Sequence, residues 1–316
     1  MKRILLLGAC VLLVITSLSA QNKGNRQKTD TAKEQSLYVT LANGQVIPRL
    51  CYGTWQTPAG EVTYNGVSEA LKVGYRHIDT AFDYGNEQSI GEAVRNSGIP
   101  RSEIFITTKL SASVKTYEGA KAAINQSLAN LGLDYIDIYI IHAPWPWANV
   151  GEDYNKANVE VWRAMEEAYK EGKLKSIGLS NFNIADVQNI LNNCSVKPVV
   201  NEVKVHVGNY PRTLVDFCKN NDIVVMGYST LSTGALIGRE DIQQIADRYG
   251  VTLPQLCIRY SLQHGVTPLV KSLKPTHMAE NLKVNFTISD DDMKVLDKLP
   301  NYSIGKFGPP MPYEGK

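Results

Sequence analysis

Short apolar runs alternate with amphipathic segments along the chain from residue 37 onward. Eight of these runs have the length and composition of β-strands: 49–53, 75–79, 104–108, 136–141, 175–179, 199–203, 223–227 and 267–270. The segments between them carry apolar residues at helical spacing, as in Val161, Met165 and Ala168, where Gly172 ends the pattern. Eight strands, each followed by a helical segment, predict an α/β fold, a (β/α)8 TIM barrel.

A doubly wound open sheet is the alternative arrangement of the same elements. An open sheet that binds a dinucleotide carries GxGxxG after its first strand, and the chain contains neither that motif nor GxxxxGK[ST]. We therefore favour the barrel. Before its first strand, residues 37–47 contain two strand-like runs around Asn43-Gly44, which predict an N-terminal β-hairpin.

The first 36 residues differ in composition from the rest. Lys2 and Arg3 precede an apolar run over residues 4–15, and residues 16–20 are mostly small, a pattern typical of a secretory signal peptide. An uncleaved membrane anchor is the second interpretation, although the run is short for a membrane span. Residues 21–36 are polar and predict a flexible tether. We therefore expect 1–20 as signal peptide or membrane anchor, 21–36 as tether and 37–316 as barrel, in a protein that is exported to the bacterial periplasm or cell envelope, or anchored in the membrane.

Charge and cysteine content exclude several classes of partner. The 316 residues have a net charge of +2, but residues 1–36 hold six basic and two acidic residues, which leaves −2 for the barrel. This balance argues against a nucleic-acid partner, and we expect contact with a membrane only through the N-terminal segment. The four cysteines beyond Cys10 have no CxxC spacing and no cluster with histidine, so we predict buried free thiols and no metal site: Cys51, Cys194, Cys218 and Cys257.

Polar residues follow the predicted strands at the end where barrels of this type carry out chemistry. A tyrosine is a poor acid, with a pKa of about 10. A neighbouring lysine favours the phenolate, an aspartate can hold that lysine, and a histidine can orient a carbonyl oxygen. Such a set can protonate an oxygen while a hydride reaches the adjacent carbon. The candidates for this set are Asp79, Tyr84, Lys109 and His142.

Four segments resemble the signature motifs of the aldo-keto reductases. They are GYRHIDTA at 74–81 followed by YGNE at 84–87, LDYID at 133–137 running to His142, GLSNF at 178–182, and KS at 271–272 with EN at 280–281. The resemblance covers about residues 37–314, and residues 305–309 are similar to bacterial members such as the diketogluconate reductases. It implies NAD(P)H-dependent reduction of aldehydes or ketones to alcohols by a monomer that binds a small carbonyl substrate. The alternative is a non-catalytic nucleotide-binding barrel, an accessory or binding protein, which has no need of Tyr84 beside Lys109.

The resemblance also implies individual roles. Tyr84 is expected to be the general acid, tuned by Lys109, which pairs with Asp79, while His142 positions the carbonyl. The substrate pocket is expected to be bordered by Trp55, His142 and Trp145. The cofactor is expected to contact Gly53, Thr54, Asp79, Ser180, Asn181, Glu202, Tyr228, Ser229, Leu231, Lys271, Ser272, His277, Glu280 and Asn281.

Two departures from the family pattern alter the expected site. The usual Asn-Gln is Asn201-Glu202 here, and an ionised glutamate accepts hydrogen bonds but donates none. Lys204, on the same face of the strand, is expected to compensate the added negative charge. The arginine common at the cofactor's 2′-phosphate is His277, whereas Lys271 is retained, so we expect NADPH as cofactor with NADH as the alternative.

Overall fold

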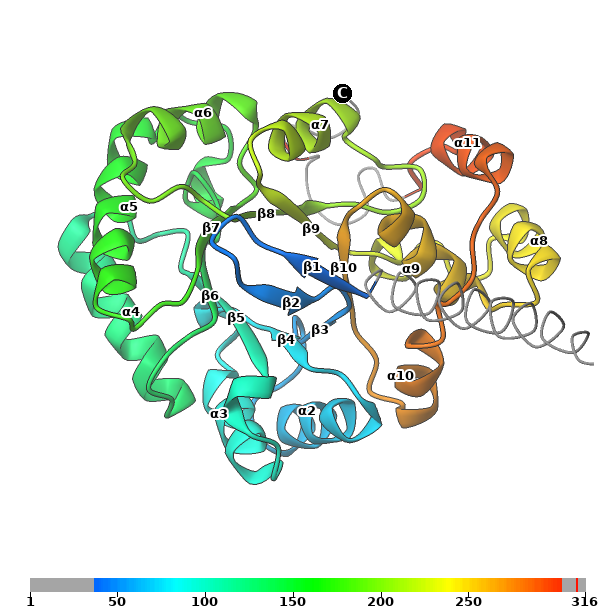
Figure 1. Ribbon diagram of the computed structural model, residues 1–316, viewed down its shortest axis with the longest axis horizontal. Helices are drawn as coiled ribbons and strands as arrows, with labels where there is room; N and C mark the ends of the chain where they lie inside the picture. The colour runs from blue at the N-terminus through cyan, green and yellow to red at the C-terminus, as the bar shows by residue number, and fades with distance from the viewer. Residues whose placement is uncertain (1–36, 303–310, 312–316) are drawn as a thin grey trace, which may run out of the picture.

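Eight parallel strands close into a barrel in the order β10-β3-β4-β5-β6-β7-β8-β9 (Figure 1). This computed structural model describes residues 37–302 and residue 311. The closed barrel confirms the predicted fold and excludes the open sheet. The segments expected at 1–20 and 21–36, and the motif at 305–309, lie outside the described residues. The barrel strands are β3 (Cys51–Gly53), β4 (His77–Asp79), β5 (Phe105–Leu110), β6 (Ile138–Ile141), β7 (Ile177–Ser180), β8 (Val200–Lys204), β9 (Val224–Tyr228) and β10 (Thr267–Val270).

Helices connect successive strands and surround the barrel (Figure 1). The predicted stripe of α5 faces inward, since Val161, Met165 and Ala168 are buried, and Gly172 follows the helix with a φ of 78°. The helices are α2 (Glu61–Val73), α3 (Glu87–Asn96), α4 (Tyr117–Leu131), α5 (Asn155–Lys170), α6 (Ile184–Asn193), α7 (Arg212–Asn220), α8 (Glu240–Arg248), α9 (Leu253–Gln263), α10 (Pro275–Asn281) and α11 (Asp290–Lys298). Short 3-10 helices are η1 (Phe82–Tyr84), η2 (Arg101–Glu103), η3 (Trp147–Asn149) and η4 (Ser232–Gly234).

The predicted N-terminal hairpin is also present. Strands β1 (Tyr38–Thr40) and β2 (Val46–Pro48) pair antiparallel. Gly44 lies in the turn with a φ of 87°, in the left-handed region that favours glycine. The Asn43-Gly44 signal therefore located the turn correctly.

The hairpin covers the amino end of the barrel. Leu41 and Ile47 are buried in the apolar cluster that fills the barrel interior. Asn43 donates to the Ser176 hydroxyl at 2.9 Å, and that hydroxyl donates to Gln45 at 2.6 Å. Ser176 immediately precedes β7, so the hairpin closes the end at which the strands begin, and a ligand reaches the interior from the other end.

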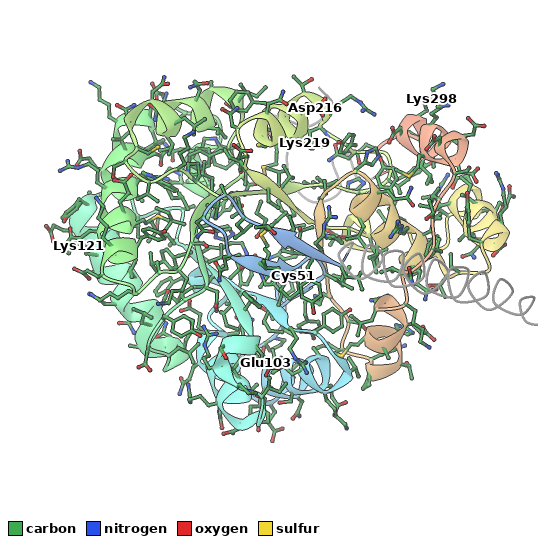
Figure 2. All side chains as sticks on the ribbon, viewed as in Figure 1. Cys51, Glu103, Lys121, Asp216, Lys219 and Lys298 are labelled. Atoms are coloured by element: carbon green, nitrogen blue, oxygen red, sulfur yellow. The ribbon has the colours of Figure 1, made fainter. Side chains whose placement is uncertain are left out.

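Three of the four described cysteines are buried free thiols. They are Cys51, which lies inside the barrel (Figure 2), Cys218 and Cys257, whereas Cys194 is half-buried. Burial raises the pKa of Cys218 to about 11 and that of Cys257 to about 12, so both remain protonated near neutral pH. Within residues 37–302 and residue 311, no group of three metal-ligating side chains comes together. None of the described helices has the length and apolar content needed to cross a membrane.

Gly91 allows α3 to pack directly on the last turn of α4. A Cβ atom at this position would lie 1.8 Å from the carbonyl oxygen of Leu131 and 2.5 Å from its carbonyl carbon. Because both atoms are backbone, the two helices would have to separate. We expect Gly91→Ala to lower the free energy of unfolding by about 1–3 kcal/mol, despite a gain of about 1 kcal/mol in helix propensity. Denaturant unfolding measures the effect. The neighbouring surface change Glu92→Ala should stay within about 0.5 kcal/mol of the parent, and equal stabilities of the two variants would contradict the close approach.

Candidate active site

A cavity of about 710 Å³ opens among the carboxyl ends of the barrel strands. Its volume is typical of small-molecule sites, which span roughly 300–1,000 Å³. Nine of the fourteen residues predicted to contact a cofactor line it: Gly53, Asp79, Ser180, Asn181, Glu202, Tyr228, Ser229, Leu231 and Lys271. Four of them are the last residue of their strand: Gly53, Asp79, Ser180 and Tyr228.

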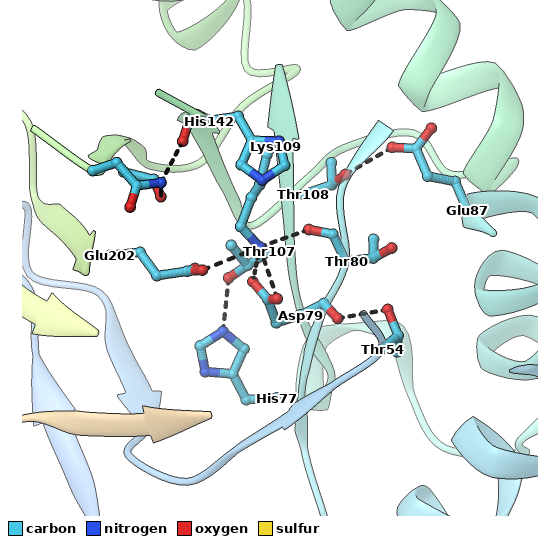
Figure 3. A network of polar contacts seen from close by, with 12 residues as sticks. Thr54, His77, Asp79, Thr80, Glu87, Thr107, Thr108, Lys109, His142 and Glu202 are labelled. Carbon is cyan, nitrogen blue, oxygen red and sulfur yellow. Dashed lines mark hydrogen bonds and ion pairs between the residues drawn. The ribbon is translucent and has the colours of Figure 1, made fainter. Parts of the chain in front are cut away.

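Lys109 connects two carboxyl groups at the floor of this cavity. Its ammonium donates to both oxygens of Asp79, at 2.7 and 2.6 Å, and to the carbonyl oxygen of Thr80 at 2.9 Å (Figure 3). The Oε1 atom of Glu202 lies 3.3 Å from the same nitrogen. Burial lowers the pKa of Lys109, but the two carboxyl groups raise it more, so the lysine stays charged. The ion-pair partner of Glu202 found here is thus Lys109, whereas the sequence suggested Lys204.

Tyr84 is placed by the 3-10 helix η1, which follows β4. The Asn86 side chain accepts from the Thr80 hydroxyl at 2.7 Å and donates to the carbonyl oxygen of Thr54 at 3.1 Å, which fixes the turn. The ammonium of Lys109 lies 5.4 Å from the centre of the Tyr84 ring. Burial raises the pKa of the Tyr84 phenol above its ordinary value, while Lys109 lowers it. The expected lowering by lysine is present, but burial outweighs it, so the phenol keeps its proton.

His142 directly follows β6 and packs edge-on against two aromatic rings. The ring centres of Tyr84 and Trp147 lie 5.8 and 5.2 Å from that of His142. Its Nδ1 atom is 3.3 Å from a carboxylate oxygen of Asp83, which also lies on η1. Burial lowers the pKa of His142 and Asp83 partly counteracts this, so the imidazole is neutral near pH 7. Asp83 was not predicted from the sequence as a site residue, although its position directly before the candidate acid Tyr84 could have indicated it.

A polar wall runs along one side of the cavity. Asn181 donates to the carbonyl oxygen of His142 at 2.9 Å and to the Ser180 hydroxyl at 3.0 Å, and it accepts from the Tyr228 hydroxyl at 2.9 Å. Asn181 and Ser229 have φ values of 62° and 57°, a left-handed conformation that non-glycine residues adopt at a cost and that concentrates at functional sites. The wall presents amide and hydroxyl groups beside the Tyr228 ring.

The substrate side of the cavity differs from the prediction in one tryptophan. Trp145 does not line the cavity, because it is buried against Ala112 and Ala143. Trp147 lies at the wall instead, 43% exposed, and its ring centre is 5.5 Å from that of Trp145. The loop after His142 therefore turns the first tryptophan into the core and the second toward the mouth. Trp55 lines the cavity as expected and is 45% exposed.

Five predicted cofactor residues do not line the cavity: Thr54, Ser272, His277, Glu280 and Asn281. Thr54 lies beneath it and donates to the carbonyl oxygen of Asp79 at 2.9 Å. Asn281 is buried at the end of α10. Their contact with a cofactor stays a prediction. Besides Asp83 and Trp147, the cavity wall includes residues that the sequence did not single out for contact: Gln56, Lys204, Thr230, Thr233, Gly234, Leu269, Val270 and Met311.

Comparison with known proteins agrees with this geometry. The model of the aldo/keto reductase family matches residues 49–301. The chain is 38% identical to glyoxal reductase of Bacillus subtilis over 262 residues, which cover 83% of this chain and 92% of the relative. It is 37% identical to 9,11-endoperoxide prostaglandin H2 reductase of Trypanosoma cruzi over 265 residues, 83% of this chain and 90% of the relative.

Solved structures support the same relationship. An aldo-keto reductase from a deep-sea metagenome library of the Medee basin superposes with a TM-score of 0.79 at 37% identity, covering 86% of this chain and 97% of that one. An aldo/keto reductase of Brucella melitensis has a TM-score of 0.77 at 37% identity, covering 83% and 97%. The chain belongs to the aldo-keto reductase family, and it is an oxidoreductase that reduces aldehydes or ketones with NAD(P)H.

Proposed function

We propose that Tyr84 supplies the proton when a carbonyl group is reduced at this cavity, and that NADPH is the preferred cofactor. The observation that carries the proposal is the phenol of Tyr84, protonated and facing the cavity next to the buried Lys109–Asp79 ion pair. Loss of NADPH absorbance, followed over a panel of aldehydes and ketones, tests it. Cofactor binding without turnover on any of them would favour the non-catalytic alternative.

The residues of the cavity fit a nicotinamide nucleotide. The ring of Tyr228 offers a flat apolar surface, and Ser180 and Asn181 offer hydroxyl and amide groups beside it. The Oε2 atom of Glu202 is buried and accepts no hydrogen bond from the described residues, so this oxygen is available to hydrogen-bond a polar group of a ligand. When bound, the reduced cofactor supplies a hydride to the carbonyl carbon.

The protein's own groups account for the other half of the reaction. Tyr84 holds a proton at the phenol oxygen, where negative charge develops on the substrate oxygen. Lys109 is kept charged and oriented by Asp79, so its field stabilises the phenolate that remains. His142 packs against the Tyr84 ring and borders the space for the carbonyl oxygen, which makes it the group that orients this oxygen.

The mouth of the cavity favours small carbonyl compounds with both apolar and polar parts. Trp55 and Trp147 expose nearly half of their surface there, and Met311 joins them. Asp83 and Lys204 add charged groups to the wall. Relatives described as reductases of glyoxal and of aldehydes support small aldehydes as the first compounds to assay.

Lys271 is the residue we propose to distinguish NADPH from NADH. Its ammonium lies at the cavity wall and donates to the carbonyl oxygen of Trp55 at 2.9 Å. A charge-assisted contact with the 2′-phosphate is worth roughly 1.5–3 kcal/mol. Lys271→Ala should therefore weaken NADPH binding by about ten- to a hundredfold and leave NADH nearly unchanged, as measured by fluorescence titration. Lys298→Ala, on α11, is the matched control. An equal loss for both cofactors would place Lys271 away from the 2′-phosphate.

A further inference from the structure

One ammonium group and two carboxyl groups are buried together at the floor of the cavity. Lys109 is 1% exposed, and Asp79 and Glu202 are each 2% exposed. Within the described residues, Lys109 is the cation in ion-pair contact with both carboxyl groups. If both carboxyl groups were ionised, the cluster would hold an uncompensated negative charge away from water, which is costly. The cluster is balanced when one carboxyl group carries a proton.

The contacts indicate which carboxyl group holds that proton. Asp79 receives two hydrogen bonds from Lys109, both shorter than 2.8 Å, and Glu202 has one contact of 3.3 Å with the same nitrogen. The Oε2 atom of Glu202 is also buried and receives no hydrogen bond from the described residues, so no donor there stabilises a negative charge on it. Burial and the neighbouring Asp79 raise the pKa of Glu202 well above its usual value, and Lys109 offsets only part of this. Glu202 is therefore the carboxyl group that carries the proton.

The titratable and charged groups around Glu202 come from several neighbouring elements. The flanking strands β7 and β9 place Ser180 and Met226 in register with it. Burial raises the pKa of the Cys51 thiol on β3 and of Tyr84 on η1, and it lowers the pKa of His77 on β4 and of His142 after β6, so all four are uncharged near neutral pH. The remaining charged groups on the cavity wall are Asp83 on η1, which is 30% exposed, Lys204, two residues along β8, and Lys271 after β10.

We propose that Glu202 is a neutral carboxylic acid, and that its proton sets how strongly Lys109 acts on Tyr84. Glu202 is thus a positioning residue for proton donation, an inference that rests on the proposed role of Tyr84. Ionisation of Glu202 raises the pKa of Tyr84. Tyr84 is then a weaker acid, and carbonyl reduction slows as the pH rises through the titration of Glu202.

Infrared spectroscopy of the protein without cofactor tests the protonation state directly. At neutral pH the parent should show the carbonyl-stretching band of a protonated carboxylic acid, shifted in D2O and lost in Glu202→Gln. Glu166→Gln is the matched control, because Glu166 is a buried glutamate outside the cavity whose Oε1 atom accepts from the backbone amides of Ser195 and Val196. This control should retain the band. Parent and Glu202→Gln spectra that superimpose in this region would overturn the proposal.

The pH profile of reduction gives a second readout that a purely structural role would not move. With saturating NADPH, kcat of the parent should fall several-fold toward a plateau as the pH rises, and Glu202→Gln should lack this fall. An unchanged fall in Glu202→Gln would overturn the link between Glu202 and Tyr84. If no variant oxidises NADPH, the proposed function fails, while the infrared band still decides whether Glu202 holds a proton.

Discussion

Tyr84→Phe is expected to lower kcat for carbonyl reduction by at least about 10²-fold, the range of a lost general acid. The substitution removes the phenol oxygen and keeps the ring, so the edge-on packing against His142, with ring centres 5.8 Å apart, is preserved. NADPH affinity should change little, because the loss falls on the transition state rather than on binding. Steady-state kinetics and fluorescence titration of NADPH separate the two effects.

Tyr260→Phe provides the matched control. Tyr260 is buried like much of the core, and its hydroxyl donates to Asp297 at 2.7 Å, away from the cavity. Its replacement should reduce stability and leave kcat at the parental value. Turnover retained in Tyr84→Phe would remove this residue from the proton-donating role.

Lys109→Met is expected to affect both activity and stability. The substitution keeps the length of the side chain and leaves the buried carboxylate of Asp79 without its cation, a change that costs about 3–5 kcal/mol when one partner of a buried pair is removed. The variant should therefore unfold at a lower temperature than the parent. Thermal unfolding of parent and variant at neutral pH measures this difference.

A double variant separates the stability cost of the unpaired Asp79 carboxylate from the loss of activity. In Lys109→Met with Asp79→Asn the floor of the cavity carries neither the ammonium nor the Asp79 carboxylate. It should recover much of the stability at neutral pH and none of the activity, because Tyr84 still lacks a cation beside it. A Lys109→Met variant whose activity and stability match the parent across the pH range would contradict the electrostatic role of Lys109.

The barrel was predictable because its pattern is local. Each strand is a short apolar run, and the hairpin turn is encoded by Asn43-Gly44. The strand ends were less accurate. Lys109 was expected after its strand but lies within β5 (Phe105–Leu110), and Ser180 and Tyr228 end β7 and β9. Polar residues at these positions resemble loop residues in sequence, whereas in this barrel the layer of side chains at the carboxyl end is polar.

The contacts that the sequence could not give are those between distant strands. Glu202 on β8 and Lys109 on β5 meet only because the barrel brings both strands to one interior, so the sequence offered the nearby Lys204 instead. Trp145 and Trp147 lie on either side of Pro146, and their order alone does not say which ring turns inward. Asp83 became a site residue only through its 3.3 Å contact with His142, across two loops.

The hairpin that closes the amino end of the barrel makes the two ends of the described chain unequal as points of attachment. Residue 37 enters beside β1, on the face opposite the cavity, whereas Met311 lines the cavity wall. An enzyme immobilised on a solid support through the residue 37 side would present its open mouth to the solution. A partner domain joined near residue 311 would instead compete with substrate for the entrance. Biosensor or biocatalyst designs based on this chain should therefore be linked through the hairpin side.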